Sequence, residues 1–161
     1  MRRWILWGIL GIVISVCGWY VVISFPRVYF EKDFTLNDLQ NRPLRLSRFA
    51  GQPIVLYFFS PRCKDCKEET PWLNELYATY RKDGLVVIGV GIRYPEEIRK
   101  FVKEQEIEYP VVVDVDLAVC KDFGVFFLPH LVFINRQGKI AATVTGKVSL
   151  EKLKEHLGSI L

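Results

Sequence analysis

Residues 54–66 read Ile-Val-Leu-Tyr-Phe-Phe-Ser-Pro-Arg-Cys-Lys-Asp-Cys, and this stretch decides the fold of the chain. Its first six residues are all apolar or aromatic, which is typical of a central β-strand that is covered on both faces. The two cysteines open a segment with helical periodicity, so Cys63 is expected at the start of a helix. Unpaired backbone N–H groups and the helix dipole favour negative charge there. Because the thiolate is the species that attacks disulfides, the stretch predicts dithiol–disulfide chemistry.

The rest of the chain continues this alternation of strands and helices. Helical signals extend to about residue 81, with Pro71 inside, and Ser47 is expected to cap a short turn that ends at Gly51. Apolar runs and turn residues predict a leading hairpin (34–36 and 44–46) and strands at 85–90, 111–113, 131–134 and 139–145. They also predict helices from 95, at 117–123 and after Ser149. The order predicts an α/β fold with a mixed sheet.

The N-terminus carries a separate apolar segment. Residues 4–25 contain no charged side chain, and 22 residues of helix are long enough to cross a bilayer core of about 30 Å. Aromatic residues lie near both ends of the segment, and Arg2 and Arg3 precede it. The positive-inside rule therefore predicts one membrane-spanning helix with its N-terminus in the cytoplasm and the remaining chain outside.

A cleaved signal peptide is the alternative to this anchor. The apolar run exceeds the usual h-region of about 7–15 residues, and no small-x-small cleavage site follows it. Cleavage before Cys17, as in a lipoprotein, would need a small residue where bulky Val16 stands. The expected organisation is a membrane anchor at 1–25, a connector at 26–33 and one folded domain at 34–161.

Charge and cysteine content exclude several classes of function. The 22 basic and 18 acidic residues nearly balance, and no basic cluster is interleaved with aromatic residues, so no nucleic-acid partner is expected. Four cysteines in a domain of this size do not make a structural disulfide framework. Cys17 lies in the apolar segment, and Cys120 is expected to be a buried, inert thiol because Leu117, Cys120 and Phe123 share one helix face.

Taken together, these features resemble the thioredoxin superfamily, and most closely its membrane-anchored TlpA/ResA-like thiol-disulfide oxidoreductases. The resemblance covers residues 34–161. It is carried by the leading hairpin, the strand followed by CxxC, Pro71 in the active-site helix, a helix–strand insertion at 95–114, and the later Leu128-Pro129 pair. It implies a thioredoxin-like fold. Arg62 and His130 depart from the family, which usually has Trp before the first cysteine and often Thr after the active-site proline.

The cysteine pair is expected to be the catalytic centre. Cys63 is the candidate nucleophile, which would form a mixed disulfide with a substrate, and Cys66 is the candidate resolving thiol. A zinc half-site is the alternative. Zinc takes about four ligands, and the chain offers only the distant Cys120, His130 and His156, so no metal is expected. The redox-active disulfide itself would serve in place of a cofactor.

The resemblance also suggests roles for residues around the pair. Glu69 matches the acidic position of the family, where it would tune the pKa of the thiols; an ordinary solvated glutamate is the alternative. Pro129 matches the cis-proline of the family, which would leave the backbone at Leu128 free to pair with a substrate strand. An ordinary loop proline is the alternative. Arg62 and His130 are expected at the rim of the substrate-binding surface, although His130 could instead tune the thiols or only begin a strand.

The expected function is a disulfide reductase outside the cytoplasm. Family members typically keep cysteines of secreted proteins or apocytochrome c reduced and draw electrons from a transmembrane thiol donor. A disulfide oxidant or isomerase is the alternative within the class. A Sco-like copper-binding assembly factor is an alternative from another class, but that family uses CxxxC. A peroxidase is disfavoured, because Leu56 and Ser60 stand where peroxiredoxins carry Pro and Thr.

Overall fold

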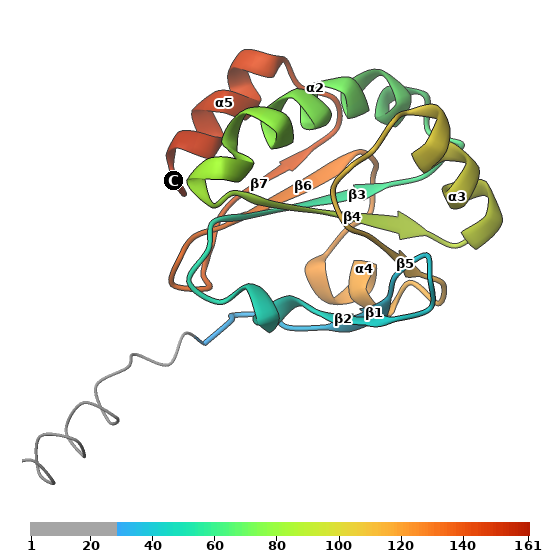
Figure 1. The fold of residues 1–161 in the computed structure, drawn as a ribbon, viewed down its shortest axis with the longest axis horizontal. Helices are drawn as coiled ribbons and strands as arrows, with labels where there is room; N and C mark the ends of the chain where they lie inside the picture. The colour runs from blue at the N-terminus through green and yellow to red at the C-terminus, as the bar shows by residue number, and fades with distance from the viewer. Residues whose placement is uncertain (1–28) are drawn as a thin grey trace, which may run out of the picture.

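A mixed five-stranded sheet forms the centre of the molecule (Figure 1). The computed structural model describes residues 29–161. The strand order is β5-β4-β3-β6-β7, and β3 (Ile54–Phe59) occupies the middle. It pairs in parallel with β4 (Val86–Ile92) and antiparallel with β6 (His130–Ile134). The outer strands are β5 (Val111–Asp114) and β7 (Ile140–Thr145).

Helices cover both faces of this sheet (Figure 1). One face carries α2 (Lys64–Tyr80), which the short η2 (Arg81–Asp83) follows, together with α3 (Pro95–Glu104) and α5 (Leu150–Gly158). The opposite face carries α4 (Ala118–Phe123), η1 (Leu46–Phe49) and the hairpin of β1 (Thr35–Asn37) and β2 (Pro43–Arg45). The predicted hairpin, the helix–strand insertion of α3 and β5, and the mixed sheet are therefore confirmed.

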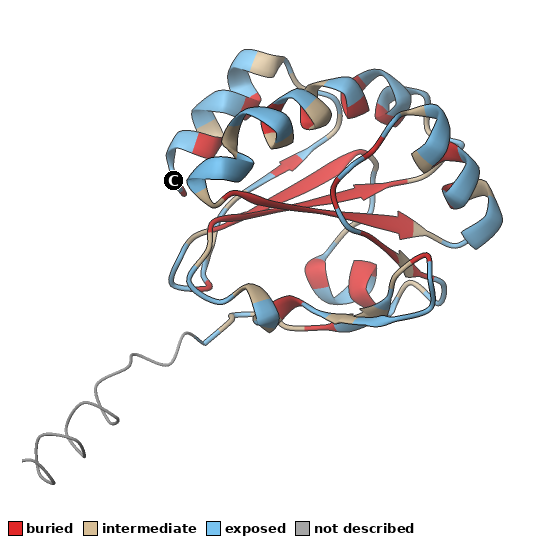
Figure 2. Ribbon diagram, in the orientation of Figure 1, coloured by how far each residue is buried: buried red, intermediate tan, exposed pale blue. Residues whose placement is uncertain are grey.

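Strand β3 connects the two halves of the core. All six of its residues are buried, as are most residues of the neighbouring β4 and β6 (Figure 2). Because side chains alternate along a strand, Val55, Tyr57 and Phe59 pack in the cluster beneath α2 and α5, whereas Ile54, Leu56 and Phe58 pack towards α4. The apolar run predicted as a central strand thus supplies both sides of the core.

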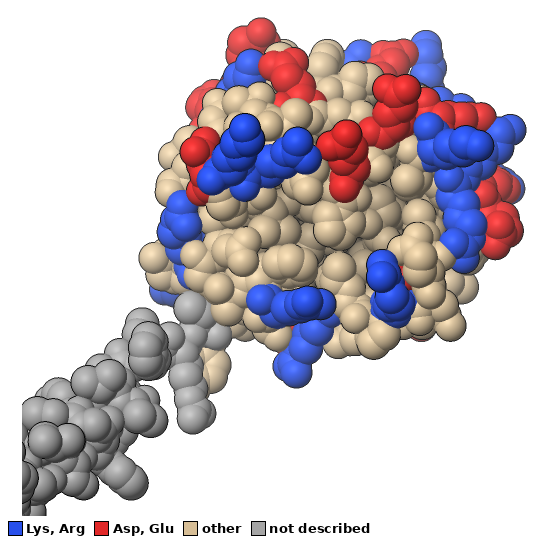
Figure 3. All heavy atoms as spheres, viewed as in Figure 1, with Lys and Arg blue, Asp and Glu red and all other residues tan. Residues whose placement is uncertain are grey.

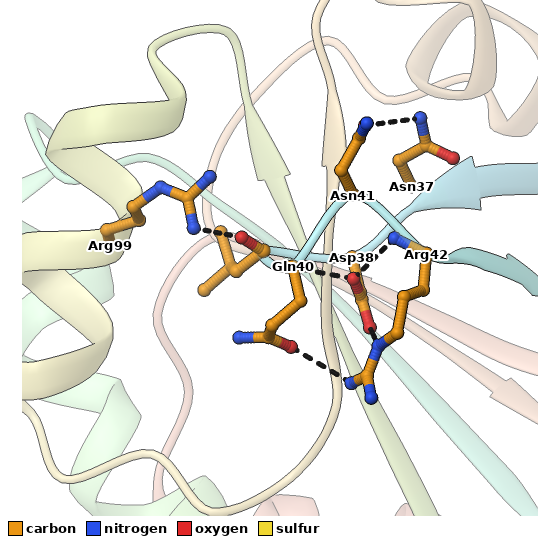
Figure 4. Close-up of polar contacts among 7 residues, drawn as sticks. Asn37, Asp38, Gln40, Asn41, Arg42 and Arg99 are labelled. Carbon is orange, nitrogen blue, oxygen red and sulfur yellow. Dashed lines mark hydrogen bonds and ion pairs between the residues drawn. The ribbon is translucent and has the colours of Figure 1, made fainter.

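The tip of the β1–β2 hairpin is held by a compact set of polar contacts (Figure 4). The Asp38 carboxylate accepts hydrogen bonds from the backbone N–H groups of Gln40 and Arg42, at 2.8 Å each, and from Arg42 Nε at 2.8 Å. These hydrogen bonds, the one from the Arg42 N–H foremost, lower the pKa of Asp38. Arg99 of α3 donates to the Leu39 carbonyl oxygen, so the hairpin is fastened to the insertion helix.

Residues 29–33, assigned to the connector, lie against the domain. The Glu31 N–H donates to the Gly138 carbonyl oxygen at 3.0 Å. The Asp33 carboxylate accepts from the Ser47 N–H at 2.9 Å and forms an ion pair with Arg45 at 2.8 Å. The expectation that Ser47 caps the turn after β2 is wrong. Arg45 is the N-cap residue of η1 and makes no side-chain cap bond. The Ser47 N–H donates instead to the Asp33 carboxylate.

The predicted membrane anchor, residues 4–25, lies outside the described residues. Between residues 29 and 161, every helix is too short or too polar to cross a bilayer.

Candidate active site

Cys63 and Cys66 form a disulfide at the beginning of α2. Their Cα atoms are 5.2 Å apart. Cys63 is the N-cap residue of the helix, and its Sγ accepts a hydrogen bond from the Cys66 N–H at 3.1 Å. Cys63 is half-buried, whereas Cys66 has no exposed surface. The first sulfur is therefore the one that a partner can reach, and the same N–H can stabilise it as a thiolate.

A buried hydroxyl pair fixes the backbone behind Cys66. The Cys66 carbonyl oxygen accepts from the Tyr57 hydroxyl at 2.9 Å and from the Thr70 hydroxyl at 2.7 Å. Burial raises the pKa of Tyr57, which keeps its hydroxyl protonated and able to donate. Neither Tyr57 nor Thr70 was predicted from the sequence to belong to the site. Tyr57 carries the one polar side-chain atom in the apolar run of β3, and this was the available signal.

Glu69 follows Cys66 by three residues in α2 and has no exposed surface, so the alternative of a solvated helix glutamate is wrong. Its Oε1 accepts from the Val148 N–H at 3.2 Å, while Oε2 is buried without a hydrogen-bond partner among the described residues. Burial, and secondarily the charge of Asp65, raises the pKa of Glu69 to about 7. The carboxyl group can therefore exchange a proton near neutral pH.

Arg62 precedes the nucleophilic sulfur and is bound by the insertion helix. Its Nε donates to Glu97 Oε2 at 2.9 Å and its second terminal nitrogen donates to Glu97 Oε1 at 2.6 Å. The centre of the guanidinium lies 3.9 Å from the centroid of the Tyr94 ring. The Arg62 hydrogen bond lowers the pKa of Glu97, and the same bond raises the pKa of Arg62. Both side chains are thus charged.

On the other side of the disulfide, two lysines share one acid. Glu68 pairs with Lys147 and, at 3.8 Å, with Lys64 of the same helix. The Lys147 ammonium also lies 5.5 Å from the centroid of the Trp72 ring. Three cations, Arg62, Lys64 and Lys147, therefore face two carboxylates: Arg62 faces Glu97, and the two lysines share Glu68. Basic and acidic side chains are likewise interspersed on the face shown in Figure 3.

The Leu128–Pro129 peptide bond is cis, and Pro129 directly precedes β6. His130 pairs with Phe58 across the sheet, which brings Pro129 to the end of β3 from which the cysteine loop departs. His130 is 5% exposed, and its Nδ1 lies 2.9 Å from the Thr145 hydroxyl. Burial lowers its pKa. Its side chain belongs to the face of the sheet that carries α4, and its contact with a substrate stays a prediction.

Cys120, the third cysteine among the described residues, lies apart from the site. Cys120 is 5% exposed in α4, and its backbone N–H donates to Asp114 Oδ2 at 2.7 Å. Among residues 29–161 no group of three or more His, Cys, Asp or Glu side chains is placed to hold a metal ion. A cleft of about 680 Å³ beside the β1–β2 turn is lined by residues such as Arg48, Tyr77 and Tyr109, and none of the cysteines borders it.

Known proteins with similar sequences identify the family of this chain. The model of the AhpC/TSA family matches residues 31–143. The thiol-disulfide oxidoreductase ResA of Geobacillus thermodenitrificans is 36% identical over 129 residues, which cover 80% of this chain and 74% of the relative. ResA of Geobacillus kaustophilus is 33% identical over 164 residues, which cover 95% of this chain and 92% of the relative.

Solved structures agree with the fold. A Chlorobium tepidum protein assigned as a thiol:disulfide interchange protein DsbE superimposes with a TM-score of 0.77 at 25% identity, covering 86% of this chain and all of the other. StoA from Bacillus subtilis gives a TM-score of 0.67 at 22% identity, covering 78% and 96%. The fold is thus thioredoxin-like. With its paired Cys63 and Cys66, the chain belongs to the AhpC/TSA family and, within it, to the ResA-like thiol-disulfide oxidoreductases.

Proposed function

We propose that this protein is anchored in the cytoplasmic membrane and reduces disulfides of secreted proteins, such as apocytochrome c, on the outer face. The observation that carries the reductive direction is the pairing of Arg62, Lys64 and Lys147 with carboxylates around the disulfide. Unpaired cations would stabilise the Cys63 thiolate and hence the reduced protein, which would make it an oxidant. Compensated cations favour a reductant.

The reaction is two successive thiol–disulfide exchanges. The Cys63 thiolate attacks one sulfur of the client disulfide, forms a mixed disulfide and releases the other client sulfur as a thiolate, which takes up a proton. The Cys66 thiolate then attacks Cys63 Sγ, re-forms the Cys63–Cys66 disulfide and releases the second client thiol. Two electrons pass to the client, and a transmembrane thiol donor restores them to the pair.

Residues around the pair have distinct roles in this scheme. Glu69, whose pKa is raised to about 7 by burial, would accept and return the proton of the buried Cys66 thiol. The backbone at Leu128 and Pro129 would pair with an extended client segment, with Arg62 and His130 at the margins of that surface. The redox-active disulfide serves in place of a cofactor, and no metal or nucleic acid takes part.

Exposed aromatic side chains support a polypeptide client. Phe126 and Phe127 are 85% and 72% exposed and directly precede Leu128. Tyr94, in contact with Arg62, is 41% exposed. Apolar side chains beside a reactive disulfide suit an extended segment of an unfolded chain, because burying them against the client contributes to binding.

The reduction potential of the Cys63–Cys66 pair tests the direction of the reaction. The full chain in detergent micelles would be equilibrated with glutathione buffers, and the fraction of disulfide measured. A potential near about −270 mV, as in thioredoxin, is expected for a reductant. A value near about −120 mV, as in DsbA, would identify an oxidant that installs disulfides and would overturn the proposal.

A further inference from the structure

The contact between Arg62 and Glu97 joins the reactive loop to an insertion that lies 35 residues further along the chain. Two parallel hydrogen bonds and the Tyr94 ring hold the guanidinium in one orientation. Such bidentate pairs are more specific in geometry than single-point ion pairs, because the planar fork of arginine matches both carboxylate oxygens. Arg62 is therefore directed at Glu97 of α3.

The position of Glu97 is itself well defined. Pro95 begins α3, and Glu97 lies in its first turn, where the helix dipole favours a carboxylate. The neighbouring Glu96 faces away and pairs with Arg99 at 3.3 Å. Two acids of one helix turn thus have different partners, and only Glu97 contacts the loop that carries the nucleophile.

We propose that Glu97 is a positioning residue for the exchange reaction: it holds the Arg62 guanidinium against the Tyr94 ring and so prevents that charge from stabilising the Cys63 thiolate. The inference rests on the proposed reductase function, because a less stabilised thiolate keeps the reduced protein a good electron donor. Substrate contact is not required for this effect, since it acts on the free dithiol.

The other charged groups on and around α2 stay the same in every variant of the test. On α2 itself, Lys64 pairs with Glu68, and Lys67 and Asp65 are exposed. Lys147, which precedes α5, also pairs with Glu68. Behind the pair lie Glu69 and the Tyr57 hydroxyl. Removing Glu97 alone leaves Arg62 without its acid, so the charge balance at the sulfur changes in one known direction.

The test is the pH dependence of Cys63 alkylation by iodoacetamide in the reduced full chain, followed by mass spectrometry of the Cys63 peptide. Glu97→Gln is expected to lower the midpoint, with about a twofold rise in the thiolate fraction, which is the size expected for one exposed charge acting through water. Arg62→Ala is expected to raise it, since Glu97 then has no cation. The double variant should return close to the unmodified protein.

Glu96→Gln is the matched control, because it removes the same charge from the same helix turn without touching Arg62. It should leave the midpoint unchanged, and 1 M salt should abolish the effect of Glu97→Gln because the screening length falls to about 3 Å. A purely structural pair would lower thermal stability in both single variants without shifting the midpoint in opposite directions. Equal midpoints for Glu97→Gln and Glu96→Gln would overturn the proposal, whatever the potential of the unmodified pair.

Discussion

Cys66 and Cys120 are both buried cysteines on opposite faces of one sheet, yet their surroundings differ in every respect that matters for reactivity. Cys66 lies in the first turn of a 17-residue helix and is bonded to half-exposed Cys63. Cys120 lies in a six-residue helix beside the buried Asp114 carboxylate. Burial, followed by its contact with Asp114, raises the pKa of Cys120 to about 12.

The comparison teaches that burial alone does not distinguish a reactive thiol from an inert one. Both side chains are at most 5% exposed. The difference comes from the partner sulfur, from an N–H group aimed at a sulfur, and from the charge of the nearest acid. Glu69 near the pair can be neutral at physiological pH, because its pKa is raised to about 7 by burial.

The largest expected effect comes from removing the thiols in turn. Cys63→Ser should lower reduction of a protein disulfide by at least about a thousandfold, because neither Cys66 nor Cys120, both buried, can begin the exchange. Cys66→Ser should accumulate a mixed disulfide between Cys63 and the client, visible on a non-reducing gel. Cys120→Ser is the control and should keep the rate within about twofold, as its thiol takes no part. Loss of activity in Cys120→Ser would show that the Cys120 thiol takes part in the exchange, contrary to its description as inert.

Alkylation of the native, reduced protein measures the same difference in kinetics. At pH 7 the thiolate fraction of Cys120 should be about three and a half decades below that of an unperturbed cysteine, whose pKa is about 8.5. Mass-resolved iodoacetamide labelling should therefore modify Cys63 long before Cys120. Unfolding in urea should make the two labelling rates similar. Comparable labelling rates in the folded protein would show that Cys120 is accessible and activated.

The buried Glu69 carboxyl group should make the free energy of unfolding depend on pH. Since folding raises the pKa of Glu69 from 4.5 to about 7, its contribution is complete below pH 4.5 and is lost as pH rises through about 7. The loss is on the order of 3 kcal/mol. Urea unfolding of the oxidised protein at pH 4.5 and pH 8 should show it.

Glu69→Gln should remove most of that dependence, because the amide does not titrate. Glu75→Gln, on the exposed side of the same helix, is the matched control and should leave it intact. If the two variants depend on pH to the same extent, the raised pKa of Glu69 is not the cause.

The smallest expected effect concerns the backbone behind Cys66. Tyr57→Phe removes the hydroxyl that donates to the Cys66 carbonyl oxygen, while the Thr70 hydroxyl continues to donate. A lost hydrogen bond of this kind costs about 1 kcal/mol of unfolding free energy. The measured urea midpoint should fall accordingly, with alkylation of Cys120 unchanged. A variant as stable as the unmodified protein would show that Thr70 alone satisfies that carbonyl.

The sequence was sufficient for the elements and for the cysteine pair because both depend on local pattern. The apolar run of β3 and the periodicity of α2 predicted their places, and the helix start predicted which sulfur is accessible. Contacts between distant segments could not be predicted in this way. The Arg62–Glu97 pair depends on where α3 packs, and the burial of Glu69 depends on the loop that contains Val148.

The face of the sheet on which His130 lies could have been predicted from the alternation of side chains along β6. Leu131 and Phe133 pack with the cluster beneath α2, so the alternation of a strand places His130 and Val132 on the opposite face. Proximity to Pro129 in sequence suggested a position at the rim of the site. Strand register, which fixes the direction of every side chain, packs the ring 6.1 Å from Phe58, and a contact of His130 with a client stays a prediction.

The docking of residues 29–33 on the domain has a consequence for where the enzyme can work. If residues 4–25 cross the bilayer as proposed, three residues, 26–28, connect that segment to the docked residues 29–33. Three residues can span at most about 10 Å. The disulfide would then stay within about one domain diameter of the lipid surface and would not reach the bulk compartment. Partners confined to the same layer would meet it at a high local concentration, whereas a freely diffusing client would have to come to the membrane first.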